Sequence, residues 1–501
     1  MKKYLLLPVL LCTITAFAQK ISNPDKFAKT ITAADLRKHL SIVAGPEMEG
    51  RETGTVGQRK AAAYIEQQFR NMGLTPGNNG SFQMEYPLYQ DTLIDASIEV
   101  NDKKFTVNKD FLINLATNAP ATYRFSEIVF MGEGINDSSR NDYKGVNVRG
   151  KLVMVFGNIG PKSGLQPNNS VNNKITAATR NGAAAILVIN TTNSQMGMMR
   201  KGRLFVNPFR RSVVIQQYFI SPDIAKAIMG EDFTTAINNN SIKAKTYNAN
   251  VLLDFKKELI KTVSSNVVAV LEGSDKKDEY VFLTAHYDHL GKRDSVIYYG
   301  ADDDGSGTVS VLEMAEAFVK AKAAGKGPRR SIVFMTVSGE EKGLLGSEYY
   351  SEHPLFPLDK TSVDLNTDMV GRIGIEYRNE KDSMNYVYLI GDDKLSSDLT
   401  GIADKANKKF KLKIDRKYND LNDPNRFYFR SDHYNFAKKG IPILFYSDGV
   451  HADYHKPTDT VDKINFGLME NRVRYIFSTA WEIANRDDML KRDIPLPVME
   501  R

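Results

Sequence analysis

Short apolar runs and amphipathic segments alternate along the second half of the chain, after about residue 255. Apolar runs of four to eight residues are typical of buried strands, and apolar residues repeated at three- and four-residue spacing are typical of helices. This pattern predicts strands at 266–273, 280–286, 331–338, 385–391 and 441–447, and helices at 306–321, 395–407 and 470–485. Strands separated by helices predict a mostly parallel (mixed) α/β sheet that is covered by helices on both faces.

The first half of the chain has a different pattern. Within residues 31–74, apolar positions such as Ala62, Ile65, Phe69 and Met72 recur at helical spacing and stop at Gly73, which predicts helices. From about 97 to 255 the chain is rich in Asn, Gly and Thr, and its apolar runs resemble strands. A chain of 501 residues is longer than the chains that ordinarily pack around a single hydrophobic core. We therefore expect residues 97–255 to form a β-rich domain inserted between two parts of the first.

The N-terminus predicts export. Two lysines precede an apolar run and the small-residue pattern Ala16-Phe17-Ala18, so residues 1–18 are expected to be a signal peptide. Cys12, the chain's single cysteine, lies inside this segment, and Leu11 before it disfavours a lipid anchor. The mature protein would be periplasmic or secreted, with no integral membrane segment, and its metal ligands would have to be His, Asp or Glu.

Composition and charge exclude several function classes. With 42% hydrophobic and 25% charged residues, the chain is typical of soluble globular proteins. The net charge of +7 falls to about +5 without Lys2 and Lys3, a weak field for a chain of this size. Because we find no long basic run interleaved with aromatic residues, no nucleic-acid partner is expected. The sequence does not determine the oligomeric state.

Acidic and histidine side chains gather at the predicted strand ends and in nearby loops. His286 and Asp288 lie at the end of the strand expected at 280–286, where α/β sheets place their functional groups. Residues two apart in extended chain face the same way, so this pair can share one site. Comparable positions hold Asp302, Asp303 and Asp304, Glu340 and Glu341, Asp368, and His451 and His455.

Each of these segments alone has an ordinary structural explanation. Acidic residues are favourable at a helix N-terminus, and a single histidine is more often a hydrogen-bonded structural residue than a ligand. Together, however, they would leave unpaired negative charge in a cleft, because most of the segments have no nearby Lys or Arg. A divalent cation removes that cost. His, Asp and Glu ligands suit catalytic zinc, and two ions about 3.5–4 Å apart would share one carboxylate.

These five segments, in this order, resemble those of the co-catalytic zinc aminopeptidases of the M28 peptidase family. The resemblance runs from MEGRETGT at Met48 to KPTDT at Thr460. The middle region, with GKLVMVFG and AAAILVIN, resembles the protease-associated (PA) domain that many members carry. The resemblance implies a peptidase domain at 19–96 and 256–501, with an inserted PA domain at 97–255.

The resemblance also implies a set of ligands. His286 and Asp368 would hold one zinc ion, Glu341 and His455 would hold the other, and Asp303 would bridge the two. Three consecutive aspartates leave Asp302 and Asp304 open as alternatives for the bridge. Co²⁺ or Mn²⁺ are possible substitutes for the two Zn²⁺ ions.

The catalytic roles follow from the same resemblance. Glu340 would act as general base towards a metal-activated water, and Asp288 would hold the ring of His286 through its other nitrogen. Substrate contacts are expected from Asp432, His433, Tyr446 and Tyr454. His289 is near the site in sequence but is expected to be redundant as a ligand.

The expected activity is removal of N-terminal residues from peptides, so a peptide substrate is the expected partner. Three alternatives remain open on the same fold: a carboxypeptidase, a glutaminyl cyclase and a non-catalytic binding protein. A carboxypeptidase would need a cation for the substrate's free carboxylate, for which Arg372, Arg426 and Arg430 are candidates. A binding protein should have lost metal ligands or the general base, yet all of the predicted ligands and Glu340 remain.

Overall fold

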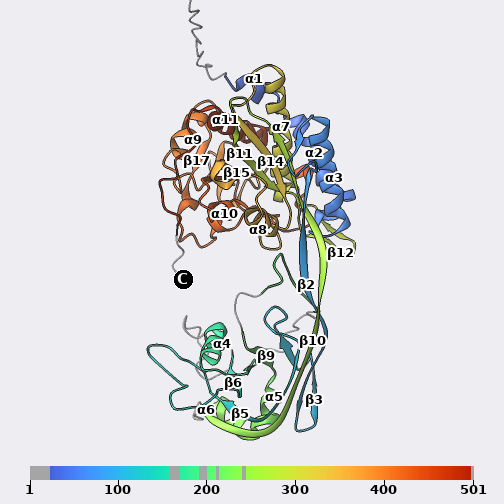
Figure 1. Cartoon of the computed structure of the whole chain (residues 1–501), viewed down its shortest axis with the longest axis vertical. Helices are drawn as coiled ribbons and strands as arrows, with labels where there is room; N and C mark the ends of the chain where they lie inside the picture. The colour runs from blue at the N-terminus through green and yellow to red at the C-terminus, as the bar shows by residue number, and fades with distance from the viewer. Residues whose placement is uncertain (1–22, 158–169, 191–199, 210–213, 240–243, 498–501) are drawn as a thin grey trace, which may run out of the picture. The chain divides into compact units, whose positions relative to one another are not determined.

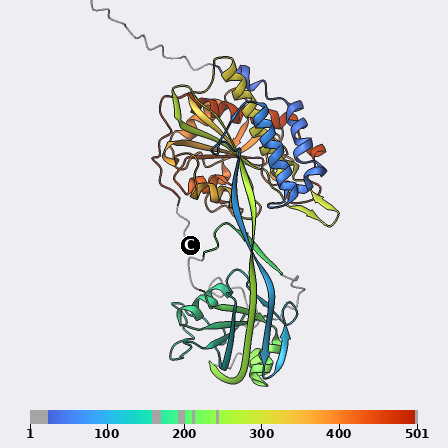
Figure 2. The ribbon, with the colours of Figure 1, turned by 45° about the vertical axis from the view of Figure 1, so that its right-hand side comes forward.

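The chain divides into two compact units in the computed structural model, which describes residues 23–157, 170–190, 200–209, 214–239 and 244–497 (Figures 1 and 2). Met1–Glu85 and Ser265–Arg501 form the first unit, and Tyr86–Ser264 form the second. The predicted signal peptide at 1–18, including Cys12, lies outside the described residues.

The first unit is built on a mixed sheet with the strand order β17-β16-β18-β15-β11-β14-β10. Strands β11, β14, β15 and β18 are mutually parallel, while β10 and β16 run antiparallel to their neighbours β14 and β18. This confirms the predicted fold class. The strands of this unit are β1 (Thr75–Pro76), β11 (Lys276–His286), β12 (Gly291–Arg293), β13 (Val296–Tyr298), β14 (Arg330–Val337), β15 (Thr361–Thr367), β16 (Tyr386–Ile390), β17 (Lys413–Asp415), β18 (Ile443–Ser447) and the C-terminal part of β10 (Lys245–Leu271).

Helices cover both faces of this sheet. Successive residues of a strand point to opposite faces of the sheet, and each face has its own apolar core. Leu283 and Leu365 pack with the helices α2, α3, α7 and α11 on one face, whereas Phe282 and Phe445 pack with α8 and α10 on the other. The helices are α1 (Asp25–Ala28), α2 (Ala33–Val43), α3 (Val56–Asn71), α7 (Gly307–Ala323), α8 (Leu345–Glu352), α9 (Leu399–Asn407), α10 (His433–Ala437) and α11 (Phe466–Asn485). Shorter helical turns include η1 (Pro46–Arg51), η3 (Ala301–Ser306), η4 (Leu358–Lys360), η5 (Ile375–Tyr377), η6 (Lys417–Asn419), η7 (Phe427–Phe429) and η8 (Val461–Lys463).

The predicted N-terminal helix is confirmed as α3. The hydroxyl of Thr55 accepts a hydrogen bond from the Gln58 N–H and caps the helix, and Ala62, Ile65 and Phe69 are buried as their spacing predicted. Gly73 directly follows the helix cap with a φ of +73°, a conformation that favours glycine. Helix α3 therefore ends where the sequence placed its end, just before Gly73.

The parallel strands bring their carboxyl ends together at one edge of the sheet. His286 of β11 pairs in register with Val337 of β14, and Thr284 pairs with Asn366 of β15. The segments that follow these three strands, after His286, Val337 and Thr367, therefore leave the sheet side by side. The segment at 451–455 also comes shortly after a strand that ends at this edge, because β18 pairs in parallel with β15.

The second unit has its own parallel strands and its own apolar core. Its strands follow the order β10-β5-β6-β7-β9-β4, and β2 pairs separately with β3 and β8. The elements are β2 (Gln83–Val100), β3 (Lys103–Thr106), β4 (Phe111–Ile113), β5 (Ala121–Phe130), β6 (Leu152–Phe156), β7 (Ala185–Ile189), β8 (Lys201–Phe205), β9 (Gln216–Ile220), the N-terminal part of β10, α4 (Val171–Arg180), α5 (Pro222–Met229) and α6 (Asp232–Asn239).

The unit boundaries differ from the predicted ones by about ten residues, because they fall inside the long strands β2 and β10. The change in composition near residues 97 and 255 occurs within these strands, and no turn marks the boundary itself. The assignment of this unit to the PA family stays a prediction.

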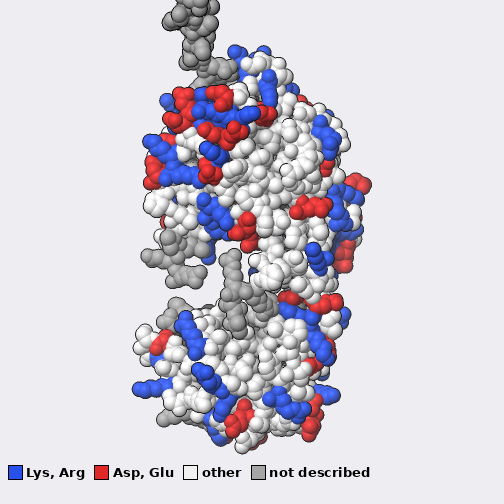
Figure 3. Space-filling view, viewed as in Figure 1, with Lys and Arg blue, Asp and Glu red and all other residues white. Residues whose placement is uncertain are grey.

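Two surface features bear on partners. On the face drawn in Figure 3, Lys and Arg side chains are interspersed with Asp and Glu, as the weak net charge predicts. Among the described residues, no helix is long and apolar enough to span a membrane.

Candidate metal centre

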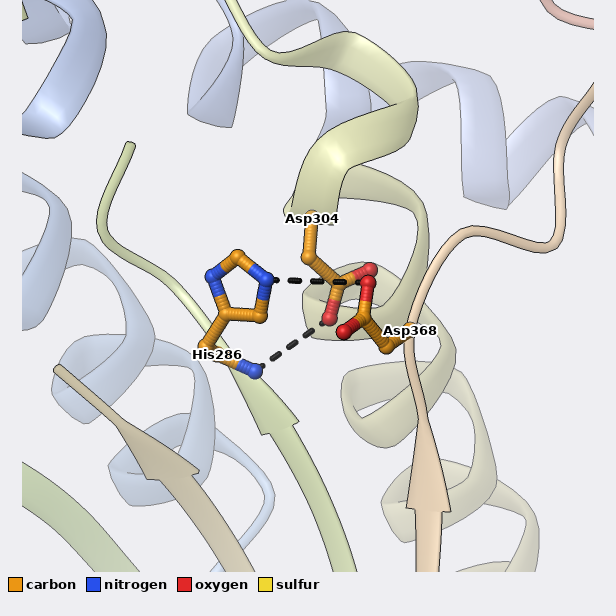
Figure 4. Close-up of side chains that lie close together, drawn as sticks. All are labelled: His286, Asp304 and Asp368. Atoms are coloured by element: carbon orange, nitrogen blue, oxygen red, sulfur yellow. Dashed lines mark hydrogen bonds and ion pairs between the residues drawn. The ribbon is translucent and has the colours of Figure 1, made fainter. Parts of the chain in front are cut away.

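Histidine and carboxylate side chains converge at the sheet edge. The His286 ring, buried at the end of β11, places Nε2 3.3 Å from Asp303 Oδ1. The same nitrogen lies 3.6 Å from Asp368 Oδ1 (Figure 4). The other ring nitrogen, Nδ1, lies 3.1 Å from the Asp288 backbone oxygen and 3.8 Å from the Asp288 carboxylate. The ring is therefore held by the main chain of Asp288, where the resemblance implied its side chain.

The three consecutive aspartates face three different partners. Asp303 directs Oδ1 towards His286 and Oδ2 towards His455 Nε2, at 3.0 Å. Asp302 accepts the Gly371 N–H. Asp304 accepts N–H groups from Gly307 and Met369 on one oxygen and from His286 on the other. Only Asp303 of the three lies between the rings of His286 and His455.

A second group of ligands lies on the far side of Asp303. Glu341 Oε2 is 3.3 Å from His455 Nε2, and its Oε1 is 2.8 Å from Nδ1 of the buried His289. His289 thus contacts a predicted ligand, which the sequence analysis did not expect. The available signal was its place three residues after His286 in HYDHLG.

Crowding of the carboxylates shifts their pKa values in opposite directions. Burial, followed by the charges of Glu341 and Asp368, raises the pKa of Glu340 well above its usual range. For Asp303, burial alone would raise the pKa, but the close polar contacts with the rings of His286 and His455 outweigh it and hold the pKa well below the usual range. The carboxylate between the two rings is therefore more readily ionised than that of Glu340.

The donor set fits divalent cations. His286 Nε2, Asp303 Oδ2 and Glu341 Oε1 are buried, and none makes a hydrogen bond within the described part of the chain. Two groups bring one ligand atom per residue within 4.8 Å of one another: His286 with Asp304 and Asp368, and His289 with Asp303 and Glu341. Because both Asp304 oxygens already accept main-chain N–H groups, we favour Asp303 as the partner of His286. Nitrogen and oxygen donors without sulfur suit zinc.

The chain matches a known family at this site. Residues 266–480 match the model of peptidase family M28. This region contains an M28 peptidase domain. A probable leucine aminopeptidase of Arthroderma otae is 28% identical over 227 residues, which cover 44% of this chain and 57% of the relative. The vacuolar membrane protease of Saccharomyces cerevisiae is 32% identical over 125 residues, covering 25% of this chain and 12% of the relative. The chain thus spans at most about half the length of these relatives.

The M28 domain also has a structural neighbour that supports its fold. An aminopeptidase from Aneurinibacillus sp. strain AM-1 aligns with a TM-score of 0.55 at 20% identity, covering 95% of this chain and all of that one. At this identity the likeness shows the fold alone.

Three of the predicted substrate residues lie inside the M28 domain, away from any surface. Asp432 is fully buried and accepts a hydrogen bond from the Ser347 hydroxyl at 2.5 Å. His433 is fully buried, stacks on Phe445, and has its pKa lowered by burial to about 3. Tyr446 lies in the apolar core. The expectation that these three side chains contact substrate is therefore corrected, because all three are fully buried.

Tyr454 remains at the mouth of the centre. Its ring stacks on His455 with centroids 3.8 Å apart, and its hydroxyl accepts a hydrogen bond from Arg430 at 3.0 Å. Tyr454 is therefore the one of the four predicted substrate residues that lies beside a predicted ligand and is still partly exposed.

Proposed function

We propose that the chain is an exported di-zinc aminopeptidase that hydrolyses N-terminal residues from peptides. The observation that carries the proposal is the position of Asp303, whose two oxygens face two different histidines while Asp368 and Glu341 lie beside them. One carboxylate shared by two sets of His and carboxylate ligands is the arrangement that two-metal hydrolases use. The M28 match supports peptide hydrolysis, and the leucine aminopeptidase relative supports an N-terminal substrate.

In this proposal, His286 and Asp368 would hold one zinc ion, Glu341 and His455 would hold the other, and Asp303 would be shared by the two. Co²⁺ or Mn²⁺ would be accepted by the same ligands. His289 fixes the orientation of Glu341 by its contact with Oε1, which leaves Oε2 towards His455.

Glu340 is the proposed general base. Zinc, when bound, supplies a Lewis acid for the scissile carbonyl and lowers the pKa of a water molecule. The Glu340 carboxylate lies 4.0 Å from His286 Nε2, and its backbone N–H donates to Asp288 Oδ1, which fixes the start of the loop. Glu340 can therefore take a proton from the attacking water and return it to the departing amine.

One alternative on the same fold has an observation in its favour. A carboxypeptidase requires a cation near the scissile bond. Arg372 is held by Asp453 at 2.8 Å, whereas the exposed Arg430 donates to Tyr454 beside His455. A substrate carboxylate could reach Arg430, so both ends of the substrate have to be tested.

The decisive experiment compares metal content and substrate choice in the purified mature chain. We expect about two zinc ions per chain, and cleavage of aminoacyl chromogenic amides with a free α-amine. N-acetylated amides and N-acylated dipeptides with a free carboxylate should not be cleaved. Cleavage of only the N-acylated dipeptides would favour the carboxypeptidase, and absence of both metal and turnover after zinc is added would refute the proposal.

Two adjacent substitutions test the separate roles of the glutamates. Glu340→Gln should retain both metals and lose about 10²–10⁴-fold in kcat, because it removes only the base. Glu341→Gln should lose one metal, because it removes a ligand. Full activity in Glu340→Gln would exclude Glu340 as the base.

A further inference from the structure

A short segment outside the matched region 266–480 contacts three of the loops that form the metal centre. Residues 51–53 begin at the last residue of η1 and precede α3, more than two hundred residues before the first predicted ligand. Gly50 precedes the segment with a φ of +69°, and a Cβ there would lie 2.4 Å from the backbone oxygens of Gly291 and Tyr298. Arg51 itself has a φ of +55°, which is uncommon for a residue with a side chain. Such backbone conformations persist where surrounding contacts fix them, as they do at functional sites.

Arg51 joins the loop that carries His286 to the loop that leads to Asp303. Its guanidinium is fully buried. Nε donates to the backbone oxygen of Tyr287 at 2.7 Å, and Nη1 and Nη2 donate to those of Tyr299 and Gly300 at 2.8 and 2.9 Å. Tyr287 directly follows His286, and Gly300 lies three residues before Asp303. A rigid fork of five N–H donors thus sets the spacing between two ligand-bearing loops.

The same side chain places a positive charge under a cluster of carboxylates. Asp288, Asp303, Asp304 and Asp459 all interact electrostatically with the guanidinium, although no carboxylate lies within ion-pair distance of it among the described residues. Burying a cation without a direct ion pair is costly unless nearby negative charge offsets it. The negative centre supplies that offset, and Arg51 in return lowers the repulsion among its carboxylates.

The next two residues contact the other site loops. Glu52 accepts hydrogen bonds from Lys342 Nζ at 2.8 Å and from Arg293, and Lys342 directly follows Glu341. The Thr53 hydroxyl donates to Asp288 Oδ2 at 2.6 Å. Asp288 Oδ1 accepts the Glu340 N–H, so Thr53 also acts on the loop of the proposed base.

From these contacts we propose that Arg51–Thr53 is a positioning element of the metal centre, in which Arg51 fixes the His286 and Asp303 loops relative to each other. This inference rests on the proposed function, because it assigns these residues a role towards the metal ions. It predicts that zinc affinity depends on a segment outside the matched region 266–480.

The test measures zinc affinity by competition with a chromophoric chelator in full-length variants. Arg51→Lys keeps the charge and loses the fork, and Arg51→Ala loses both. We expect zinc affinity to fall about 10–100-fold, the effect typical of residues that orient metal ligands. Added guanidinium, far below the concentrations that unfold proteins, should restore the affinity of Arg51→Ala, and sodium chloride at equal concentration should not. With Co²⁺ as probe, the visible spectrum of Arg51→Lys should differ from wild type.

Arg330→Ala is the matched control. Arg330 is also fully buried, pairs with Glu279 at 2.7 Å and donates to the backbone oxygens of Ile483 and Arg486. It begins β14, at the opposite end of the strand from the centre, roughly 23 Å away at 3.3 Å per residue. We expect it to lower the stability of the fold and leave zinc affinity unchanged.

Distinct results overturn the inference and the proposed function. Zinc affinity within about threefold of wild type in both Arg51 variants, or an equal loss in Arg330→Ala, would overturn the inference alone. If neither Arg51 variant folds, Thr53→Val removes only the hydroxyl from a side chain of the same shape, and unchanged zinc affinity in that variant would overturn it. A wild-type chain that binds no divalent cation would overturn the proposed function itself.

Discussion

Replacing Glu313 by glutamine should stabilise the fold at pH 8 and leave it nearly unchanged at pH 5. Glu313 lies on α7 and is 1% exposed, and its Oε1 is 3.6 Å from His39 Nε2. Burial lowers the pKa of His39, and the other ring nitrogen of His39 is bonded to the Tyr64 hydroxyl at 2.7 Å. The contact between Glu313 and His39 is therefore between neutral groups at neutral pH.

The size and sign of the effect follow from linkage. Burial, reinforced by Glu316 and Asp35, raises the pKa of Glu313 from 4.5 to about 8. Between these two values the folded chain binds a proton at Glu313 that the unfolded chain does not, so stability falls as the pH rises. The full difference between the two pKa values corresponds to about 5 kcal/mol in the free energy of unfolding, at about 1.4 kcal/mol per pKa unit. This value is an upper limit. We expect at least about 2 kcal/mol of it between pH 5 and pH 8.

The assay is urea unfolding of wild type and Glu313→Gln at both pH values, with equal zinc. At each pH we compare the free energy of unfolding of Glu313→Gln with that of wild type. The quantity of interest is how much this difference changes between pH 5 and pH 8, because any metal contribution cancels in it. Glu482→Gln is the control, because Glu482 lies on α11 in a partly exposed pair with Lys405, is not among the charges that act on Glu313, and should show little pH-dependent difference. Parallel pH dependence in wild type and Glu313→Gln would refute the reasoning.

Two further predictions concern the metal centre. Asp459→Ala should lower zinc affinity at least about tenfold, because the buried Asp459 Oδ2 accepts the N–H groups of both Asp302 and Asp303. Asp459→Asn keeps an acceptor and should lose less affinity. Wild-type zinc affinity in the alanine variant would contradict this prediction. His289→Ala should weaken binding of the zinc ion proposed at Glu341 and spare the one proposed at Asp368, because His289 contacts Glu341 and not Asp368. A zinc titration in which both ions bind equally more weakly would contradict this prediction.

Much of the fold could be predicted from hydrophobic periodicity, because the strands β11, β14, β16 and β18 are apolar runs with apolar neighbours on both faces. The boundaries of the second unit at 86–264 could not be predicted, since β2 and β10 continue through them. The ligand set followed from residue type, order and resemblance. Its three-dimensional support could not be predicted, because Arg51, Thr53 and His289 act through contacts that no local pattern records.

The one central strand that periodicity missed is β15, and the reason is connected to the site. All seven of its residues are buried, yet Asp364 and Asn366 are polar and interrupt the apolar pattern. One side-chain oxygen of each residue has a polar partner beneath the centre: Thr284 on the neighbouring strand β11 lies 2.7 Å from Asp364 Oδ1 and 3.1 Å from Asn366 Oδ1. Burial of polar groups in a sheet is tolerated only where each finds such a partner.

The hydrogen bonds of β15 determine which oxygen of Asp368 faces the metal centre. The Asn366 side-chain amide donates to the Ser431 hydroxyl oxygen at 2.9 Å, so the single Ser431 proton is directed to Asp368 Oδ2, at 2.7 Å. That bond occupies Oδ2 and leaves Oδ1 towards His286. An apolar residue at position 366 would have made the strand easy to recognise, but Ser431 could then have turned its hydroxyl elsewhere. The polar character that makes β15 difficult to recognise in the sequence is therefore connected to the orientation of the predicted ligand Asp368.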